Sequence, residues 1–309
     1  MSASYGIVLG CPRSGTKYLM SVLGTIPDFE CVSGTLLPVA VPHAVNHDPA
    51  PDIYDALATG FERALDMYLH SGRYHSRAAA LQKWTRAPSG LGALWKALRG
   101  KRPLPERLIY KEPFLGFAPQ FVLDALPPDT SIVHAVRDGR DCARSLVENY
   151  DVLTDEKLAH LRSAEVCMGR RQDHRYVPWW VGEGHEKTFL GSSPYVRATW
   201  MWKEIVRRCH GCFSSLEAPD RDRVMRVRYE DFVRAPAEQG AALLDHFGAA
   251  PTAATRRRLE QAHTRSIGTH RQQPSRDVRA AERVAGDELA LYNYDVRTRP
   301  DPSSPLHAD

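Results

Sequence analysis

Residues 5–23 read YGIVLGCPRSGTKYLMSVL, and this stretch predicts a strand, a loop and a helix in immediate succession. Tyr5 to Leu9 is short, apolar and β-prone, Gly10 to Gly15 holds turn-forming residues, and Lys17 to Leu23 has the spacing of a helix. Where a loop enters a helix in this way, several backbone N–H groups converge on one point and can bind an anion. The stretch therefore predicts a phosphate-binding loop at the end of a strand.

The order of residues after Gly15 distinguishes this loop from the ATP-binding P-loop. That P-loop reads Gly-x4-Gly-Lys-Ser/Thr, whereas Gly15 is followed by Thr16 and then Lys17, so the lysine and the hydroxyl are exchanged. A kinase that transfers a phosphoryl group from ATP would also need an acidic magnesium site, which the sequence does not show in the expected form. A glycine-containing turn that binds no ligand is a second alternative.

The rest of the chain alternates strands with helices. Because parallel strands need crossover connections, this alternation predicts a central parallel sheet flanked by helices. We expect one α/β domain over residues 1–309, with ligands bound beyond the carboxyl ends of the strands. Further strands are predicted at Leu108–Tyr110, Ser131–Val136 and Val224–Arg228, and further helices at Asp52–Leu69, Pro119–Ala125, Asp138–Asn149, Tyr195–Arg208 and Ala237–Phe247.

Three regions interrupt the alternation. Residues 25–51 are rich in Pro, Gly and His, which predicts a long loop or lid. Residues 33–105 and 151–194 read as inserts, largely helical, outside the repeating pattern of the sheet. We therefore expect the sheet to be built from the remaining segments.

The composition limits the class of partner and the compartment. The chain has 309 residues, of which 43% are hydrophobic and 25% charged, and its formal net charge is +4. This mild charge suits an anionic small ligand better than a nucleic acid. The six cysteines make no pair of doublets, so we expect no structural metal and reduced thiols. Without a signal-like or membrane-spanning apolar run, we expect a cytoplasmic protein with no anchor, and the oligomeric state stays open.

Residues 11–19 resemble the 5′-phosphosulfate loop of sulfotransferases that use 3′-phosphoadenosine 5′-phosphosulfate (PAPS), usually P-[KR]-[ST]-G-T-[TS]-x-L. By this resemblance the loop begins at Pro12, and Arg13 is the cation over the transferring sulfate. The 5′-phosphate is expected on Ser14, Gly15, Thr16 and Lys17, and Tyr18 beside the adenine. Lys17 departs from the usual hydroxyl, but it keeps a hydrogen-bond donor and adds positive charge.

Three later segments resemble other nucleotide-binding elements of the same family. Residues 132–145, IVHAVRDGRDCARS, resemble the 3′-phosphate motif R-[DN]-x-[RK]-D-x-x-x-S, which assigns Arg137 and Ser145 to that phosphate. A surface helix rich in Arg and Asp is the alternative interpretation. Residues 228–236, RYEDFVRAP, place Tyr229 at the adenine. Residues 266–271, SIGTHR, resemble the C-terminal element that closes over PAPS, with Arg271 toward the 3′-phosphate.

The catalytic residues are expected near the end of the second predicted strand. Residues 109–114, IYKEPF, resemble the strand-end lysine element of the family, so Lys111 is the expected catalytic cation, and Glu112 orients Lys111 or the acceptor. The general base is less defined, since residues 31–35 lack the glutamate that many relatives have. Its candidates are Glu30, His43, His47, Asp48 and Glu112, with His43 and Glu112 ranked first.

Together these motifs predict a P-loop-like sulfotransferase that moves the sulfuryl group of PAPS to the hydroxyl of a small-molecule, carbohydrate or natural-product acceptor, without a metal. The two inserts are expected on the acceptor side, where Trp84, Trp95, Trp179 and Trp180 could stack on the acceptor or form core. Two alternatives stay open, the ATP-dependent kinase and a nucleotide-binding module without catalysis. The presence of Arg13 and Lys111 argues against the second.

Overall fold

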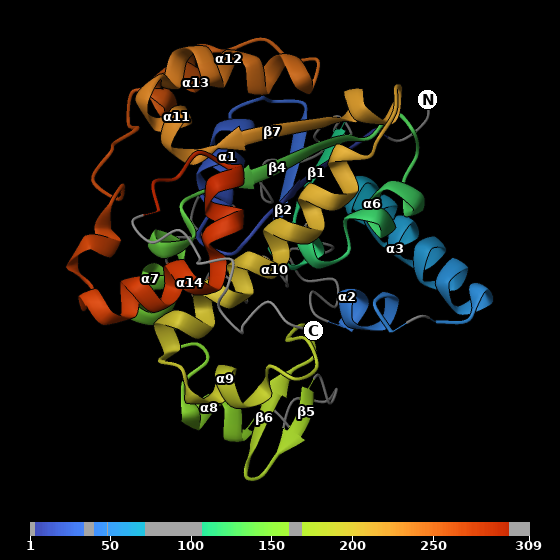
Figure 1. Cartoon of the computed structure of the whole chain (residues 1–309). Helices are drawn as coiled ribbons and strands as arrows, with labels where there is room; N and C mark the ends of the chain where they lie inside the picture. Colours follow the sequence, from blue (N-terminus) through green and yellow to red (C-terminus); the bar gives the residue numbers. More distant parts are fainter. Residues whose placement is uncertain (1–3, 34–39, 48, 72–106, 161–168, 297–309) are drawn as a thin grey trace, which may run out of the picture.

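A five-stranded parallel sheet forms the centre of the molecule (Figure 1). The computed structural model describes residues 4–33, 40–47, 49–71, 107–160 and 169–296. The strand order is β2-β3-β1-β4-β7, and every pairing is parallel. The strands are β1 (Ser4–Leu9), β2 (Phe29–Ser33), β3 (Arg107–Lys111), β4 (Ser131–Val136) and β7 (Val224–Arg228). The predicted α/β fold with a central parallel sheet is therefore confirmed.

Both faces of the sheet are buried, as parallel sheets require. Along β1, the side chains of Ile7 and Leu9 join one hydrophobic cluster, whereas Val8 between them joins the other. This alternation follows from the two-residue period of a strand, whose successive side chains point to opposite faces. The near-continuous apolar run of residues 5–9 is thus explained by burial on two sides.

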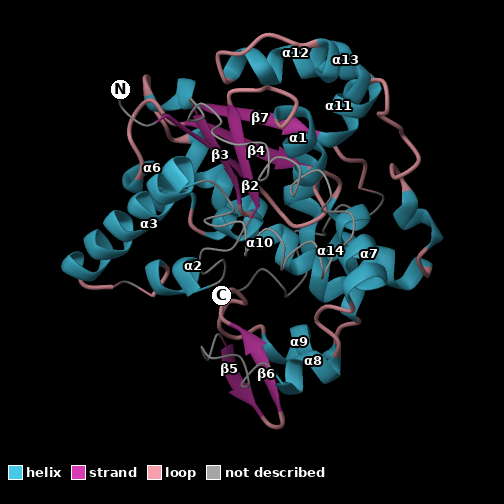
Figure 2. Cartoon of the chain, turned by 180° about the vertical axis from the view of Figure 1, so that it is seen from behind, coloured by secondary structure: helices cyan, strands magenta, loops and turns pink. Residues whose placement is uncertain are grey.

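Helices cover each face (Figure 2). One cluster includes residues of α1 (Thr16–Leu23), α11 (Tyr229–Arg234), α12 (Pro236–His246) and α13 (Ala253–Leu259). The other includes residues of α3 (Pro51–Ser71), α6 (Pro119–Ala125), α7 (Gly139–Tyr150), α10 (Pro194–Ser214) and α14 (Ser275–Leu291). Within the described residues, no helix is both long enough and apolar enough to cross a bilayer.

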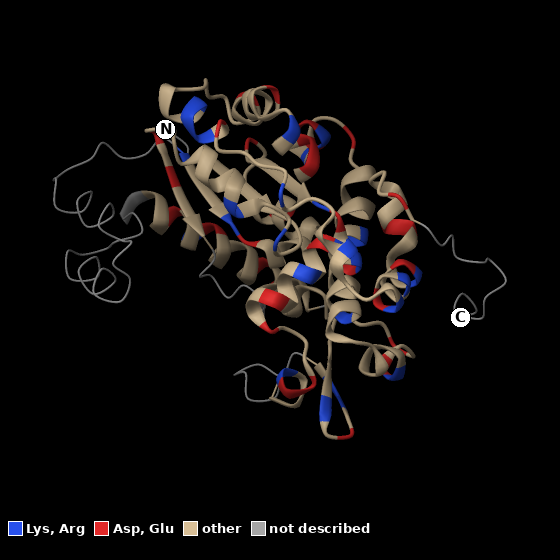
Figure 3. Ribbon diagram, turned by 90° about the vertical axis from the view of Figure 1, so that its left-hand side faces the viewer, with Lys and Arg blue, Asp and Glu red and all other residues tan. Residues whose placement is uncertain are grey.

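A smaller region lies beyond the sheet and is joined to α10. It contains α8 (Asp155–His160), the antiparallel hairpin of β5 (Gly169–Gln172) and β6 (Arg175–Pro178), and α9 (Glu186–Gly191). Arg197 of α10 is buried and fastens this region, since its guanidinium donates to the Phe189 carbonyl at 3.0 Å and to Asp155 at 2.8 Å. Basic and acidic residues are interspersed over the described elements (Figure 3).

The strand order places two loops at one crevice. From β1 the chain continues to β2 and β3 on one side, whereas β4 and β7 lie on the other side of β1. Ligands of open parallel sheets bind beyond the carboxyl ends of the strands at such a reversal. The loops that follow β1 and β4, which begin at Gly10 and Arg137, therefore meet at the expected place.

The structure corrects one prediction and extends others. Residues 25–51 are not simply a loop, because they contain β2 and α2 (Ala40–Val45). Of the five residues of β2 only Val32 is buried, so the strand has little apolar signal and depends on its pairing with β3. Predicted strands at Ser131–Val136 and Val224–Arg228 and the helix at Pro119–Ala125 are confirmed to the residue. Asp48, Trp84 and Trp95 lie outside the described residues.

Candidate functional site

A cavity of about 1200 Å³ lies at the carboxyl ends of β1, β3 and β4. Its lining includes residues of three predicted elements, namely the loop after β1, the end of β3, and the segment after β4 with the second half of α7. Ten of the residues predicted from the sequence border it: Pro12, Arg13, Gly15, Thr16, Lys17, Tyr18, Lys111, Arg137, Ser145 and Tyr229. The fold therefore brings together segments that are more than 200 residues apart in sequence.

The loop between β1 and α1 needs glycine at its last position. Gly15 has a φ of 92°, in the left-handed region, and caps α1. A Cβ atom there would lie 2.4 Å from Cδ2 of Tyr229, so the ring packs directly on the loop backbone. The first N–H groups of α1 have no acceptor within the helix and can bind an anion at this end. Ser14 serves the loop itself, since its buried hydroxyl donates to the Cys11 carbonyl at 2.6 Å and does not border the cavity.

Gly15→Ala is expected to lower the free energy of unfolding by at least about 1 to 2 kcal/mol, because the alanine would be strained at positive φ and would collide with Tyr229. Urea unfolding measures this change. Gly60→Ala is the matched control, because Gly60 lies inside α3 with nothing within 4 Å of the added methyl group. That variant should gain up to about 1 kcal/mol. Equal losses in both variants would contradict the account of this loop.

Arg13 connects the loop to α7. Its Nε donates to Oγ of Ser145 at 2.8 Å, and its Nη1 donates to the Tyr150 hydroxyl at 3.2 Å. The Arg13 guanidinium also lies over the Tyr150 ring, 5.2 Å from its centroid. Because the Ser145 hydroxyl accepts this bond, its own hydrogen can be donated to an anion in the cavity.

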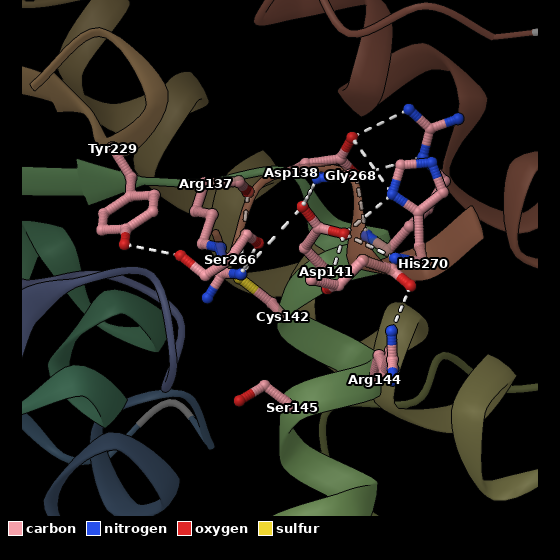
Figure 4. Close-up of polar contacts among 12 residues, drawn as sticks. Arg137, Asp138, Asp141, Cys142, Arg144, Ser145, Tyr229, Ser266, Gly268 and His270 are labelled. Atoms are coloured by element: carbon pink, nitrogen blue, oxygen red, sulfur yellow. Dashed lines mark hydrogen bonds and ion pairs between the residues drawn. The ribbon is translucent and has the colours of Figure 1, made fainter. Parts of the chain in front are cut away.

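Arg137 is buried between the loop, Tyr229 and the segment around Ser266 (Figure 4). Its Nη1 donates to the Arg13 carbonyl at 3.0 Å, its Nη2 donates to the Ser266 carbonyl, and its guanidinium lies 4.9 Å from the centroid of the Tyr229 ring. Its Nε is buried and has no hydrogen-bond partner among the described residues. Such a donor is costly unless an acceptor meets it, which is consistent with a bound anion.

Several lining residues were not identified from the sequence. Ser266 and Thr269 border the cavity, and the Ser266 hydroxyl is 2.7 Å from that of Tyr229. Arg258 also borders it, with its guanidinium 5.1 Å from the centroid of the Tyr18 ring. Ser266 and Thr269 lie in the segment 266–271 that the sequence predicted to close over PAPS, although only Arg271 was given a role there. Arg258 lies on α13, which carries no such motif, so only the fold reveals it. The predicted residue Arg271 borders a second cavity of about 470 Å³ instead.

Lys111 ends β3 and borders the cavity, whereas its neighbour Glu112 turns away from it. Burial lowers the pKa of Lys111, and the nearby charge of Lys17 lowers it further, while Glu112 opposes the shift. The Glu112 carboxylate is buried and accepts the Phe114 N–H at 3.2 Å, which caps a short 3-10 helix (η2, Pro113–Phe117). Burial raises the pKa of Glu112.

The predicted histidine lies beside one wall of the cavity. His43 is on α2, and the centroid of its ring lies 4.1 Å from that of His47 and 5.8 Å from that of Trp179. Trp179 borders the cavity, but neither histidine does. Burial lowers the pKa of His43, so its imidazole stays neutral near pH 7. Glu30, a lower-ranked candidate, lies on the edge strand β2 and also does not border the cavity.

One end of the cavity is apolar. Its side chains come from the segment after Lys111, from α7 and the turn after it, from the segment after β6, and from α10. They are Pro113, Phe114, Leu146, Val152, Leu153, Pro178, Trp179, Trp180 and Met201. Phe117 supports this wall from behind, with its ring 5.2 Å from Trp179 and stacked 5.9 Å from Trp180. In the described part of the chain, no three His, Cys, Asp or Glu side chains are grouped as a metal site requires.

Comparison with models of protein families identifies the family of this chain. A model described as "Sulfotransferase family" matches residues 7–182. Similar solved structures include the sulfotransferase domain from the curacin biosynthetic pathway, with 15% identity, 96% of this chain and 99% of that chain covered, and a TM-score of 0.49. For a sulfotransferase from Alicyclobacillus acidocaldarius the identity is 18%, the match covers 96% of this chain and 98% of that chain, and the TM-score is 0.46. For STF9 from Mycobacterium avium the identity is 14%, the match covers 96% of this chain and 79% of that chain, and the TM-score is 0.47. Comparison with curated proteins gave no match.

Proposed function

Since this chain belongs to the sulfotransferase family, we propose that it transfers the sulfuryl group of PAPS to the hydroxyl of a small acceptor with an apolar body. The observation that supports this most directly is the meeting of two anion-binding elements in one cavity. Arg13 and Ser145 are predicted to hold opposite ends of the nucleotide. Nε of Arg13 lies 2.8 Å from Oγ of Ser145, and both residues border the same cavity. A cavity of about 1200 Å³ exceeds the roughly 300–1,000 Å³ of a typical ligand pocket, so two reactants fit.

The side chains around the cavity suit a nucleotide with two phosphate positions. The N–H groups at the start of α1 would hold the 5′-phosphate, together with Lys17. Arg137, with its unpaired Nε, and the Ser145 hydroxyl would hold the 3′-phosphate. Tyr18 and Tyr229 would contact the adenine. Bound in this way, PAPS supplies an activated sulfuryl group with 3′-phosphoadenosine 5′-phosphate (PAP) as its leaving group.

Arg13 and Lys111 are the cations proposed for the transfer itself. The bond from sulfur to the bridging oxygen breaks, a bond from sulfur to the acceptor oxygen forms, and the acceptor proton passes to a base. Both cations border the cavity, where they can stabilise the charge that grows on the sulfuryl and bridging oxygens. Preorganised groups of this kind need no reorganisation during the reaction, which makes their effect large.

Glu112 and His43 stay the two candidates for the base. Burial raises the pKa of Glu112, which makes its carboxylate a better proton acceptor, and its neighbours Lys111 and Pro113 both border the cavity. His43 is kept neutral by its lowered pKa and packs against Trp179. Because neither side chain borders the cavity, either would reach the acceptor through a water molecule or a change of rotamer.

The apolar end of the cavity supports an apolar acceptor rather than a sugar. Of the α7 side chains that border the cavity, Glu148 pairs with Arg144 at 2.7 Å and the Tyr150 hydroxyl accepts from Arg13. Each hydroxyl that a sugar buries against the apolar side chains costs free energy unless it meets a hydrogen-bond partner. A flat apolar body, such as that of a phenol, would instead pack on Trp179 and Trp180.

Trp179→Ala is expected to raise the KM for a phenolic acceptor such as 2-naphthol about tenfold, with the KM for PAPS changed less than twofold. The conservative variant Trp179→Phe keeps an aromatic wall and should stay within about threefold of the wild type. Steady-state kinetics with both substrates varied measure these terms. A disaccharide used with higher kcat/KM than 2-naphthol would contradict the acceptor class.

The proposed function is tested by measuring PAP release from PAPS in the presence and absence of hydroxyl compounds, in parallel with phosphoryl transfer from ATP and magnesium. We expect PAP release that depends on the acceptor, and no transfer from ATP. Transfer from ATP would favour the kinase, whereas tight PAP binding without turnover for any phenol, alcohol or sugar would favour a nucleotide-binding module.

A further inference from the structure

The carboxylate of Asp141 holds a segment of the chain that is remote from it in sequence. Asp141 lies in the first turn of α7 and is fully buried. Its Oδ2 accepts the Gly268 N–H at 2.7 Å. Its Oδ1 accepts the His270 N–H at 2.8 Å, the His270 Nδ1–H at 2.8 Å and the Thr269 hydroxyl at 3.1 Å (Figure 4). Four donors, all from residues 268–270, thus converge on one side chain, which is about the number that a carboxylate can accept.

This arrangement requires the ionised form of Asp141. Burial alone would raise the pKa of this carboxyl, but the hydrogen bonds from His270 and Gly268 outweigh burial and lower it. An ionised carboxylate only accepts hydrogen bonds, so Nδ1 of His270 must carry a proton and donate it. A carboxamide in the same place would present an NH₂ group to at least one of these donors. Asp141→Asn is therefore a nearly isosteric change that breaks the anchor.

The anchored segment in turn contacts the nucleotide-binding residues. The Ser266 carbonyl accepts from Nη2 of Arg137, and the Ser266 hydroxyl is 2.7 Å from that of Tyr229. Arg144 adds a second tie from α7, because its Nη1 donates to the Thr269 carbonyl. Asp141 borders the second cavity and not the first, and its Oδ2 lies 4.0 Å from Nη2 of Arg137, so it acts on the proposed nucleotide site through residues 266–270 and through Arg137.

We propose that Asp141 is a positioning residue that sets the affinity for the nucleotide, because it anchors residues 266–270 where Ser266 holds Arg137 and Tyr229 in place. The proposal rests on the proposed function only in naming PAP as the ligand. Asp141 is part of the 3′-phosphate motif, from which only Arg137 and Ser145 received a role. Its four hydrogen bonds to residues 268–270 provide a role for Asp141. The structure thus links two motifs that are more than 120 residues apart.

The test compares Asp141→Asn with Glu282→Gln in the full-length protein. Glu282 is an equally buried carboxylate that pairs with Arg140 at 2.6 Å. Hydrogen exchange, calorimetric binding of PAP and thermal unfolding are measured for each variant. In Asp141→Asn we expect exchange of the Gly268 and His270 amides to rise at least tenfold while β1 and β4 stay protected, and the Kd for PAP to rise at least tenfold. In Glu282→Gln the Kd for PAP should change less than twofold.

A milder variant covers the case in which Asp141→Asn does not fold. His270→Ala keeps the Asp141 charge and the backbone bonds but removes one of the four donors, so its Kd for PAP should rise about threefold to tenfold. The proposal is overturned if the 268–270 amides are released while PAP affinity is unchanged. It is also overturned if Asp141→Asn and Glu282→Gln lose PAP affinity in proportion to their loss of melting temperature, since that is a purely structural effect. A wild-type protein that does not bind PAP contradicts the proposed function, whereas unchanged exchange in Asp141→Asn contradicts the anchor.

Discussion

Replacing Lys111 with alanine is expected to lower kcat by about a hundredfold to a thousandfold while the Kd for PAP changes little. Lys111 is half-buried at the end of β3, where its charge is directed to a cavity rather than to bulk water. Loss of a preorganised group that stabilises transition-state charge costs about 2.7–4 kcal/mol. A comparable loss in kcat and in kcat/KM is the signature of an interaction made only in the transition state.

The pH profile gives a second readout for the same residue. Burial lowers the pKa of Lys111, so its positive charge is lost at a lower pH than that of an exposed lysine. Activity that needs this charge should fall as the pH rises through the lowered pKa. Lys111→Arg keeps a charge that does not titrate in this range, so its alkaline fall should disappear even if its kcat is reduced. Lys187→Ala removes an exposed lysine of α9; it is the control and should leave kcat unchanged.

An unchanged alkaline limb in Lys111→Arg, or a Lys111→Ala variant that loses PAP affinity and turnover to the same degree, would contradict the catalytic role. The second outcome would instead make Lys111 part of the nucleotide site. Lys111 would then share nucleotide binding with Lys17, whose positive charge is close enough to lower the pKa of Lys111.

Arg137→Ala is expected to raise the Kd for PAP by a hundredfold or more, whereas the Kd for adenosine 5′-phosphate, which lacks the 3′-phosphate, should rise far less. Truncation of one partner of a buried charge pair costs about 2–5 kcal/mol or more. The arginine also ties the Arg13 and Ser266 carbonyls together, so its loss loosens both walls of the site. Calorimetric titration of each nucleotide gives the two constants directly.

The controls for this variant separate charge from geometry. Arg137→Lys keeps a point charge without the planar fork, so it should recover only part of the affinity. Arg276→Ala removes an arginine that is largely exposed and should leave both constants unchanged. If Arg137→Ala still prefers PAP over adenosine 5′-phosphate as strongly as the wild type, the 3′-phosphate is held elsewhere.

The sequence predicted the parts of the site that lie next to strands in the chain. The loop after β1 and the segment after β4 have local signatures, because a helix N-terminus and an arginine at a strand end form within a few residues. Their meeting also follows from the fold class, since the carboxyl ends of parallel strands share one edge. The cavity that Arg13, Arg137 and Ser145 border agrees with that expectation.

What the sequence did not predict depends on contacts between distant segments. Arg258 has no signature of its own, and Ser266 was matched only as part of the C-terminal element, without a role. Both join the cavity because α13 and the segment after it fold over α1 and α7. Strand β2 was missed because its pairing with β3, rather than its own apolar pattern, stabilises it. The prediction for Arg271 relied on the resemblance of residues 266–271 to the C-terminal element of the family, and in the structure Arg271 borders the second cavity.

The central claim is that one adenine nucleotide is held at its two phosphates by the loop after β1 and by Arg137 and Ser145, which lie before and within α7. A crystal structure of the protein with PAP tests this claim most directly. We predict the 5′-phosphate on the N–H groups of residues 15–17 and the 3′-phosphate between Arg137 and Ser145, with the bridging-oxygen end facing Arg13 and Lys111. A nucleotide bound in any other place, or with its two phosphates exchanged between these sites, would contradict the account.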